Sequence, residues 1–248
     1  MSFLLFTYQM MIKKYFIILV ILTLPFFLTA QTLSGMTGLL NIPSADFQSD
    51  GTFIMGANYL PAINQPIANY KPDLDAPLLG HNTGNYYFNL TFLPFLEVAY
   101  KMTFLKMGNG TINQDRAFSM RLQVIKEKEY FPSIAFGVHD AFTEVTTGNQ
   151  YSGADYVVIT KHFNFKDNRL SLTSGYGATF LRNNQFVGLF GGISLTPSFI
   201  KTFQLTAEYD TKGINIGGSL LFFNHLYFFS MAQRLQYYAG GIAYRIYL

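Results

Sequence analysis

His139 and Asp140 are the one pairing in this chain that hints at catalysis, because a histidine beside a carboxylate can move a proton in a hydrolase. They lie at the end of an alternating segment, 133–140, that predicts a strand. Neighbours on a strand point to opposite faces, so the two side chains cannot form a dyad directly. An aspartate at a strand end commonly caps the next loop. We therefore expect no catalytic residue, and a protein that is not an enzyme.

Metal, cofactor and nucleic-acid chemistry have equally little support. His81, His162 and His225 are scattered, so their spacing predicts no metal site. The chain has no cysteine, which excludes disulfides, thiol nucleophiles and thiolate ligands. No cofactor is implied, and no basic run predicts a nucleic-acid partner.

Charged side chains on alternating segments are the more informative group. They share a face opposite aromatic and aliphatic residues, as expected of strands that separate a polar from an apolar environment. An arginine facing lipid at mid-membrane costs about 2–4 kcal/mol, so Arg121 and Arg245 should point inward. The inward charges could contact a hydrophilic chain, or they could pair and plug a narrow barrel, since unpaired buried charges are costly. The set is Glu97, Lys101, Arg121, Asp155, Lys161, Glu208, Asp210 and Arg245.

About twelve strands would carry these side chains, with ten or fourteen as alternatives. The last is the clearest, because Ile242, Tyr244 and Ile246 alternate with Ala243 and Arg245. The segment 154–163 is apolar on both faces, so its orientation is the least certain. The predicted strands are 52–60, 86–93, 96–104, 117–126, 133–140, 154–163, 170–179, 189–195, 203–209, 214–222, 226–234 and 238–248.

The composition predicts a membrane barrel behind a secretory signal. Half of the residues are hydrophobic and only 12% are charged, against about 25% in soluble domains. Lys13 and Lys14 precede the apolar run 15–27, and Ala30 precedes a plausible cleavage point, so 1–30 is predicted to be a cleaved signal peptide with upstream residues. The alternatives are an uncleaved anchor and, for the barrel, a secreted β-sandwich. We predict an all-β protein with a transmembrane antiparallel β-barrel over 52–248.

The connections favour a barrel whose termini both lie in the periplasm. The connections 61–85, 105–116, 141–153 and 180–188 are long, whereas most of those at the other end are short. The long connections would face outward. Tyr70 and Tyr151 could stack on a sugar there, although ordinary exposed loops are the simpler interpretation.

The segment 31–51, between the signal and the first strand, is rich in glycine and interrupted by proline. It predicts either a periplasmic plug or docking point, or a lead-in that fixes the first strand.

Three stretches, in order, resemble the YjbH-like exopolysaccharide-associated outer-membrane proteins. They are 35–46, then 137–140 with 151–161, and finally 207–210 with Asn215 and Gly217. The chain is much shorter than the longer members of that family, and Asp155 stands where they usually have a glutamate. The residues that match the motifs are Gly35, Gly38, Asn41, Pro43, Ser44, Asp46, Asp140 and Tyr156.

The resemblance implies a barrel linked to surface polysaccharide. We accordingly expect a non-enzymatic part in export or assembly of an exopolysaccharide or capsule, in the outer membrane of a Gram-negative bacterium. The expected partners are outer-membrane lipid, the polysaccharide and other envelope export proteins. A general small-solute porin and a structural scaffold barrel are the alternatives.

Overall fold

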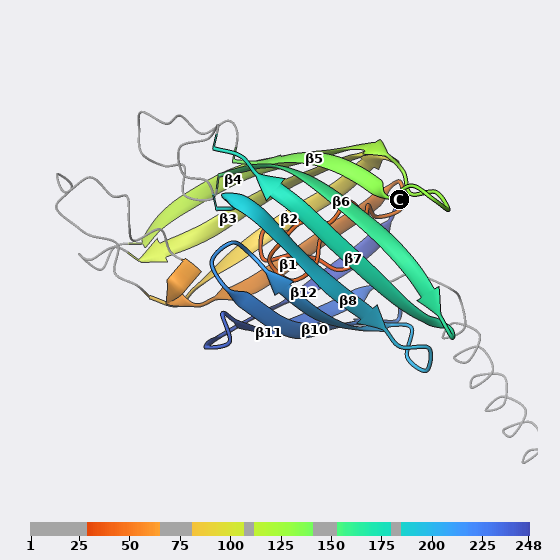
Figure 1. The fold of residues 1–248 in the computed structure, drawn as a ribbon. Helices are drawn as coiled ribbons and strands as arrows, with labels where there is room; N and C mark the ends of the chain where they lie inside the picture. Colours follow the sequence, from red (N-terminus) through yellow and green to blue (C-terminus); the bar gives the residue numbers. More distant parts are fainter. Residues whose placement is uncertain (1–28, 65–80, 107–111, 141–152, 180–184) are drawn as a thin grey trace, which may run out of the picture.

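The computed structural model describes residues 29–64, 81–106, 112–140, 153–179 and 185–248, and these form a closed antiparallel β-barrel (Figure 1). Almost all of the predicted signal peptide lies outside the described residues, as do Tyr70 and Tyr151. Within the described ranges, no helix is long and apolar enough to cross a membrane.

Twelve strands are found in the described ranges, and each corresponds to a predicted one. The largest differences are at β4 and β2, which begin at Ile112 and Thr83, before the predicted starts at 117 and 86. These extensions contain polar residues such as Gln114 and Asn85, which interrupt the hydrophobic alternation, yet their backbones continue the ladder. The elements are β1 (Thr52–Leu60), η1 (Ala62–Asn64), β2 (Thr83–Leu93), β3 (Leu96–Lys106), β4 (Ile112–Ile125), β5 (Ser133–His139), β6 (Ala154–Phe165), β7 (Asn168–Gly177), β8 (Gly188–Thr196), β9 (Phe203–Tyr209), β10 (Ile214–Phe222), β11 (Leu226–Gln233) and β12 (Tyr237–Tyr247).

Each strand pairs with its sequence neighbour, and β1 pairs with β12 to close the wall. In this seam Thr52 is opposite Tyr247, and Tyr59 is opposite Gly240. Just beyond the ladder, the Leu248 amide donates to the Gly51 carbonyl at 2.9 Å. The prediction of an all-β, twelve-stranded barrel is confirmed.

The two ends of the barrel differ in their connections. One end holds the start of β1, the end of β12 and tight turns such as that between β2 and β3. We call it the terminal end. The opposite end, the loop end, holds the last residues of β1, β3, β5 and β7 (Figure 1).

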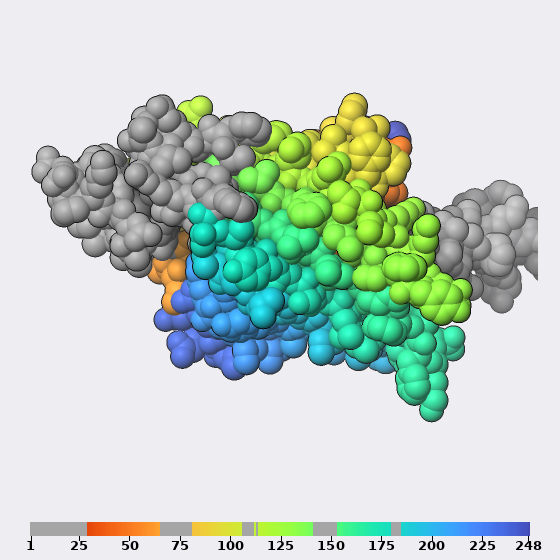
Figure 2. All heavy atoms as spheres, turned by 45° about the horizontal axis from the view of Figure 1, so that its top comes forward, coloured from red at the N-terminus to blue at the C-terminus, as the bar shows by residue number. Residues whose placement is uncertain are grey.

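The wall is apolar outside, and its polar strand residues are mostly buried inside. In β9 the outward Leu205 and Tyr209 are exposed, whereas Gln204, Thr206 and Glu208 are buried. The same alternation places large hydrophobic side chains on the outer face of nearly every strand. Figure 2 shows this outer wall over the green and teal middle strands as a continuous surface of side chains.

Aromatic rings inside the wall pack directly against glycines of the neighbouring strand. Gly137 of β5 is opposite Tyr156 of β6, and a Cβ at Gly137 would collide with the Tyr156 ring. The ring cannot move aside freely, because it makes edge contacts with His139 and Phe190 at centroid separations of 5.2 and 6.2 Å. The glycine is therefore a packing requirement of the interior.

We expect Gly137→Ala to lower the free energy of unfolding by about 1–3 kcal/mol, because it overpacks this contact. The control is Gly84→Ala in β2, where the new Cβ would come no closer than 3.2 Å to another residue. Urea unfolding of both variants, refolded in lipid vesicles, measures the difference. Equal stabilities would contradict the packing role.

Candidate functional site

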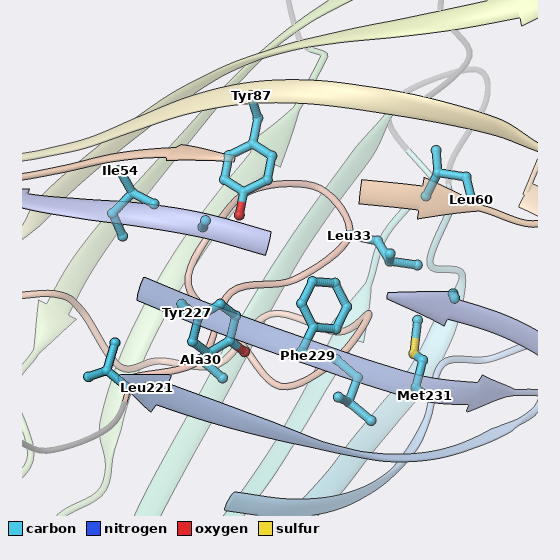
Figure 3. Packing of buried hydrophobic residues seen from close by; sticks show 12 residues of the cluster. Ala30, Leu33, Ile54, Leu60, Tyr87, Leu221, Tyr227, Phe229 and Met231 are labelled. Atoms are coloured by element: carbon cyan, nitrogen blue, oxygen red, sulfur yellow. The ribbon is translucent and has the colours of Figure 1, made fainter. Parts of the chain in front are cut away.

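Residues 30–48, which we call the interior segment, lie inside the barrel rather than at its margin (Figure 1, the orange coil within the strands). Met36, Leu40 and Ile42 are at most 1% exposed. Near the start of the segment, Ala30 and Leu33 join a buried cluster with wall residues such as Tyr227 (Figure 3). The sequence left open whether this stretch is a plug or a lead-in, and the structure places it among the inward side chains of the wall.

Two tight turns give the interior segment its shape. The Thr32 amide donates to the Met36 carbonyl at 2.9 Å, and Gly35 within this turn has φ +81°, a conformation that favours glycine. Gly35 also packs against the ring of Tyr87, where a Cβ would collide. At Gly38 a Cβ would strike the Ile42 carbonyl of the second turn. These contacts give a physical reason for both glycines of the motif.

A buried ion pair anchors the middle of the segment. Arg121 Nε of β4 lies 2.9 Å from Glu97 Oε2 of β3, and both side chains are fully buried. Glu97 Oε1 accepts hydrogen bonds from the Thr37 amide at 2.8 Å and from Asn89 at 2.6 Å. Arg121 donates to the carbonyls of Thr37 and, at 2.7 Å, Ser44. Both charges are thus matched by each other and by the segment.

The end of the segment is held by the same region of the wall. Arg121 also donates to the Asp46 carbonyl and lies 4.5 Å from the centre of the Phe47 ring, a cation–π contact. Both backbone groups of Ala45 are hydrogen-bonded to the wall. Its carbonyl accepts from Gln123 at 2.7 Å, and its amide donates to Thr160 at 2.9 Å. The backbone of this stretch is therefore fixed to β4 and β6.

A second anchor, on β9 and β10, binds the opposite side of the segment. The Glu208 carboxylate accepts the amides of Leu40 at 3.0 Å and Asn41 at 2.8 Å, and Asn215 donates to it at 2.8 Å. The Asn41 side chain donates to Asp210 at 2.7 Å. The segment thus bridges the barrel from β3 and β4 to β9 and β10.

Lys101 and Arg245 also lie inside. Lys101 is 7% exposed, and its charge interacts with those of the Asp115 and Asp140 carboxylates. Arg245 of β12 donates to the Thr29 carbonyl at 3.0 Å. Glu97, Arg121, Glu208 and Asp210 are buried inside as well. Six of the eight predicted inward charges therefore lie inside the barrel.

The expectation that Asp155 and Lys161 face inward is wrong. The inward positions of β6 hold Ala154, Tyr156 and Val158, so both charged residues occupy the alternate, outward positions. Lys161 pairs with Glu127 at 3.0 Å, at the terminal end. Because β6 is apolar on both faces, its alternation did not reveal which face is buried.

Two other motif residues lie near the loop end of the interior. Tyr156 points inward, and its hydroxyl is 3.1 Å from His139 Nε2. Asp140, which follows β5, is fully buried with φ 54°, and its amide donates to the Phe118 carbonyl at 2.8 Å. His139 therefore has a tyrosine as its partner here, and Asp140 terminates a strand.

Of the asparagines that complete the anchors, only Asn215 was singled out by the sequence, as part of a matched motif. Asn89 and Asn215 bond the two anchoring carboxylates, and Asn58 and Asn85 both donate to the Leu33 carbonyl, at 3.0 and 2.8 Å. All four occupy inward strand positions. The sequence signal that could have identified them is an asparagine at a strand position flanked by apolar residues.

A cavity of about 900 Å³, which we call the vestibule, lies between the interior segment and the wall at the terminal end. Phe47 and Gln48 of the segment form one side. Inward residues of β7, β8 and β9, among them Ser171, Ser194 and Gln204, form the other. The sequence analysis did not identify this cavity, because it lies where small polar residues leave the barrel unfilled.

His162 connects the segment to the rim of the vestibule. Its Nε2 is 3.4 Å from an Asp46 oxygen, and its Nδ1 contacts Glu127. Partial burial acts to raise the pKa of the Glu127 carboxyl, but hydrogen bonds from His162 and Lys161 outweigh it and hold this pKa below 4.5. The interactions of ionised Glu127 therefore stabilise the fold fully above pH 4.5, and this stabilisation is lost as the pH falls through the lower folded value.

These features define a class of protein: a closed β-barrel with an apolar outer wall, an interior that holds both charged residues and hydrophobic clusters, and an N-terminal segment bound inside it. The chain belongs to the YjbH family, because the family model described as "Exopolysaccharide biosynthesis protein YbjH" matches residues 30–188. The match covers the interior segment and β1 to β7. No curated protein matches the chain.

Proposed function

We propose that this protein is an outer-membrane barrel of a Gram-negative bacterium that takes part, without catalysing a reaction, in the export or assembly of a surface polysaccharide. The observation that carries the proposal is its membership of a family described by exopolysaccharide biosynthesis. Its partners would be the polymer, the surrounding lipid and other envelope export proteins.

The shape and chemistry of the wall support the outer-membrane location. Strands of about 9–11 residues are long enough to cross a bilayer when tilted, and β2, β3 and β12 each have 11. Their outer faces carry large apolar side chains such as Tyr86, Phe88 and Tyr244. Burying such a surface in lipid removes its contact with water.

The bound interior segment favours a part in polymer handling over free diffusion of small solutes. Charged groups that line an open channel would be hydrated, whereas Glu97, Arg121 and Glu208 are buried and bonded to the segment. In the proposed mechanism the barrel contacts a hydrophilic chain at its open surfaces while its centre stays blocked.

Deletion of the gene is expected to reduce surface polysaccharide strongly, and wild-type protein supplied in trans should restore it. Extracted surface polymer, measured as total hexose per cell, checks this. A deletion of a glycosyltransferase for the same polymer serves as the positive control. Unchanged polymer in the deletion strain, with loss in the control, would refute the proposed function.

A further inference from the structure

The vestibule is a cavity with no assigned role. Its volume of about 900 Å³ lies within the range of small-molecule binding sites, which runs from about 300 to 1,000 Å³. It is bounded by parts that are fixed to one another, since Arg121 and Gln123 hold the interior segment against β4. The cavity is therefore part of the folded barrel and needs no rearrangement to exist.

Its inner wall is made of hydroxyl and amide groups. Ser171, Thr173, Ser194 and Gln204 point into the barrel from three adjacent strands and are each at most 8% exposed. Hydroxyls both donate and accept hydrogen bonds, and a side-chain amide offers two donors and an acceptor. Gln204 uses a donor on Ser194 at 3.0 Å, and its carbonyl oxygen has no partner among the described residues.

An aromatic ring of the interior segment also lines the vestibule. Phe47 lines the vestibule and is only partly buried. A cavity lined by an apolar ring and by many hydrogen-bonding groups suits a sugar, whose hydroxyls are polar while its C–H faces are apolar.

The lysine, arginine and carboxylate charges around the vestibule balance. Four lysine and arginine side chains, including Arg169 and Lys201, and four carboxylates, including Asp46 and Glu127, line it. The fifth basic residue of the lining, His162, is paired with two of those carboxylates. Such a rim creates no net attraction for a polyanion, in contrast to sites that concentrate charged ligands with one sign of charge. The ligand that fits is uncharged.

We propose that the vestibule binds a segment of a neutral saccharide chain, through the hydroxyl and amide groups of β7 to β9 and the ring of Phe47. The proposal rests on the proposed function, and it adds the ligand class and the face of the barrel. Because the vestibule is at the terminal end, the polymer would be held on the periplasmic side if both termini lie there.

The test uses the refolded barrel in detergent and three hexasaccharides: cellohexaose, maltohexaose and hexagalacturonate. Saturation-transfer NMR detects binding, and calorimetry gives the dissociation constants. We expect at least one neutral hexamer to bind with a dissociation constant of about 1 mM or tighter. The acidic hexamer should bind no more tightly than the neutral one.

A matched pair of variants on β7 locates the site. Ser171→Phe fills the vestibule, whereas Ser174→Phe places the same ring on the exposed outer face of the same strand. We expect Ser171→Phe to weaken binding of the neutral hexamer about tenfold, and Ser174→Phe to leave it unchanged. Circular dichroism confirms that both variants are folded.

Three results would overturn the saccharide site: no binding of either neutral hexamer, tighter binding of hexagalacturonate, or equal weakening by both substitutions. The deletion strain separates this failure from failure of the proposed function. If the deletion strain lacks surface polymer while the purified barrel binds no neutral sugar, only the vestibule proposal fails. If surface polymer is unchanged in the deletion strain, the proposed function fails first.

Discussion

Removal of residues 31–48 is expected to turn a silent barrel into a conducting one. The interior segment is bonded to β3 and β4 on one side and to β9 and β10 on the other, so its backbone crosses the route that ions would take. The shortened chain would keep the predicted signal peptide and resume at Ser49. In planar bilayers, we expect discrete conductance steps from this variant and none from the wild type.

A point variant tests the same idea without shortening the chain. Glu208→Ala removes the acceptor for the Leu40 and Asn41 amides, and hydrogen bonds to a charged group contribute about 1.5–3 kcal/mol each. We expect brief openings from Glu208→Ala. Glu129→Ala, in the exposed turn after β4, is the control and should stay silent. Steady wild-type conductance equal to that of the shortened chain would contradict the blocked centre and favour a small-solute porin.

Arg121→Met is expected to lower the free energy of unfolding by about 3–5 kcal/mol. The substitution leaves the Glu97 carboxylate fully buried without its partner, and breaking a buried ion pair in this way costs about that much. It also removes the donors for the Thr37 and Ser44 carbonyls. Urea unfolding in lipid vesicles, followed by tyrosine fluorescence, measures the loss.

Two further variants separate the ion pair from general damage to β4. Arg116→Met removes an exposed arginine of the same strand and should change stability by less than about 0.5 kcal/mol. The double variant Glu97→Gln/Arg121→Met removes both charges, so it should be more stable than Arg121→Met alone. A double variant less stable than Arg121→Met would argue against an uncompensated carboxylate as the cause.

The strands were predictable because their side chains alternate where one face is apolar. In β9 and β12 the charged residues mark the inner face, and Glu208 and Arg245 are buried there. In β6 the apolar residues occupy both faces, so Asp155 and Lys161 were placed on the wrong side. Alternation identifies a strand, but it assigns the buried face only where the two faces differ in polarity.

The anchoring of the interior segment could not be predicted from one sequence. Asn41 and Glu208 are 167 positions apart, and nothing local to either residue indicates the other. The glycines and Pro43 marked an irregular segment, but its placement depends on partners that only the closed barrel brings together. The vestibule was missed for the same reason, because a cavity is a property of the assembled wall.

The pairing of β1 with β12 has a consequence for the order in which the protein folds. The first and last strands form one seam, so the wall cannot close until β12 has been synthesised, and until then the edge of β1 can pair with other chains. Residues 30–48 directly precede β1 and contact both early and late strands. The sheet therefore has to enclose these residues as it closes into a barrel. Long-range strand pairing of this kind makes folding slow. Until the seam forms, the open sheet consequently has to be protected from pairing with other chains.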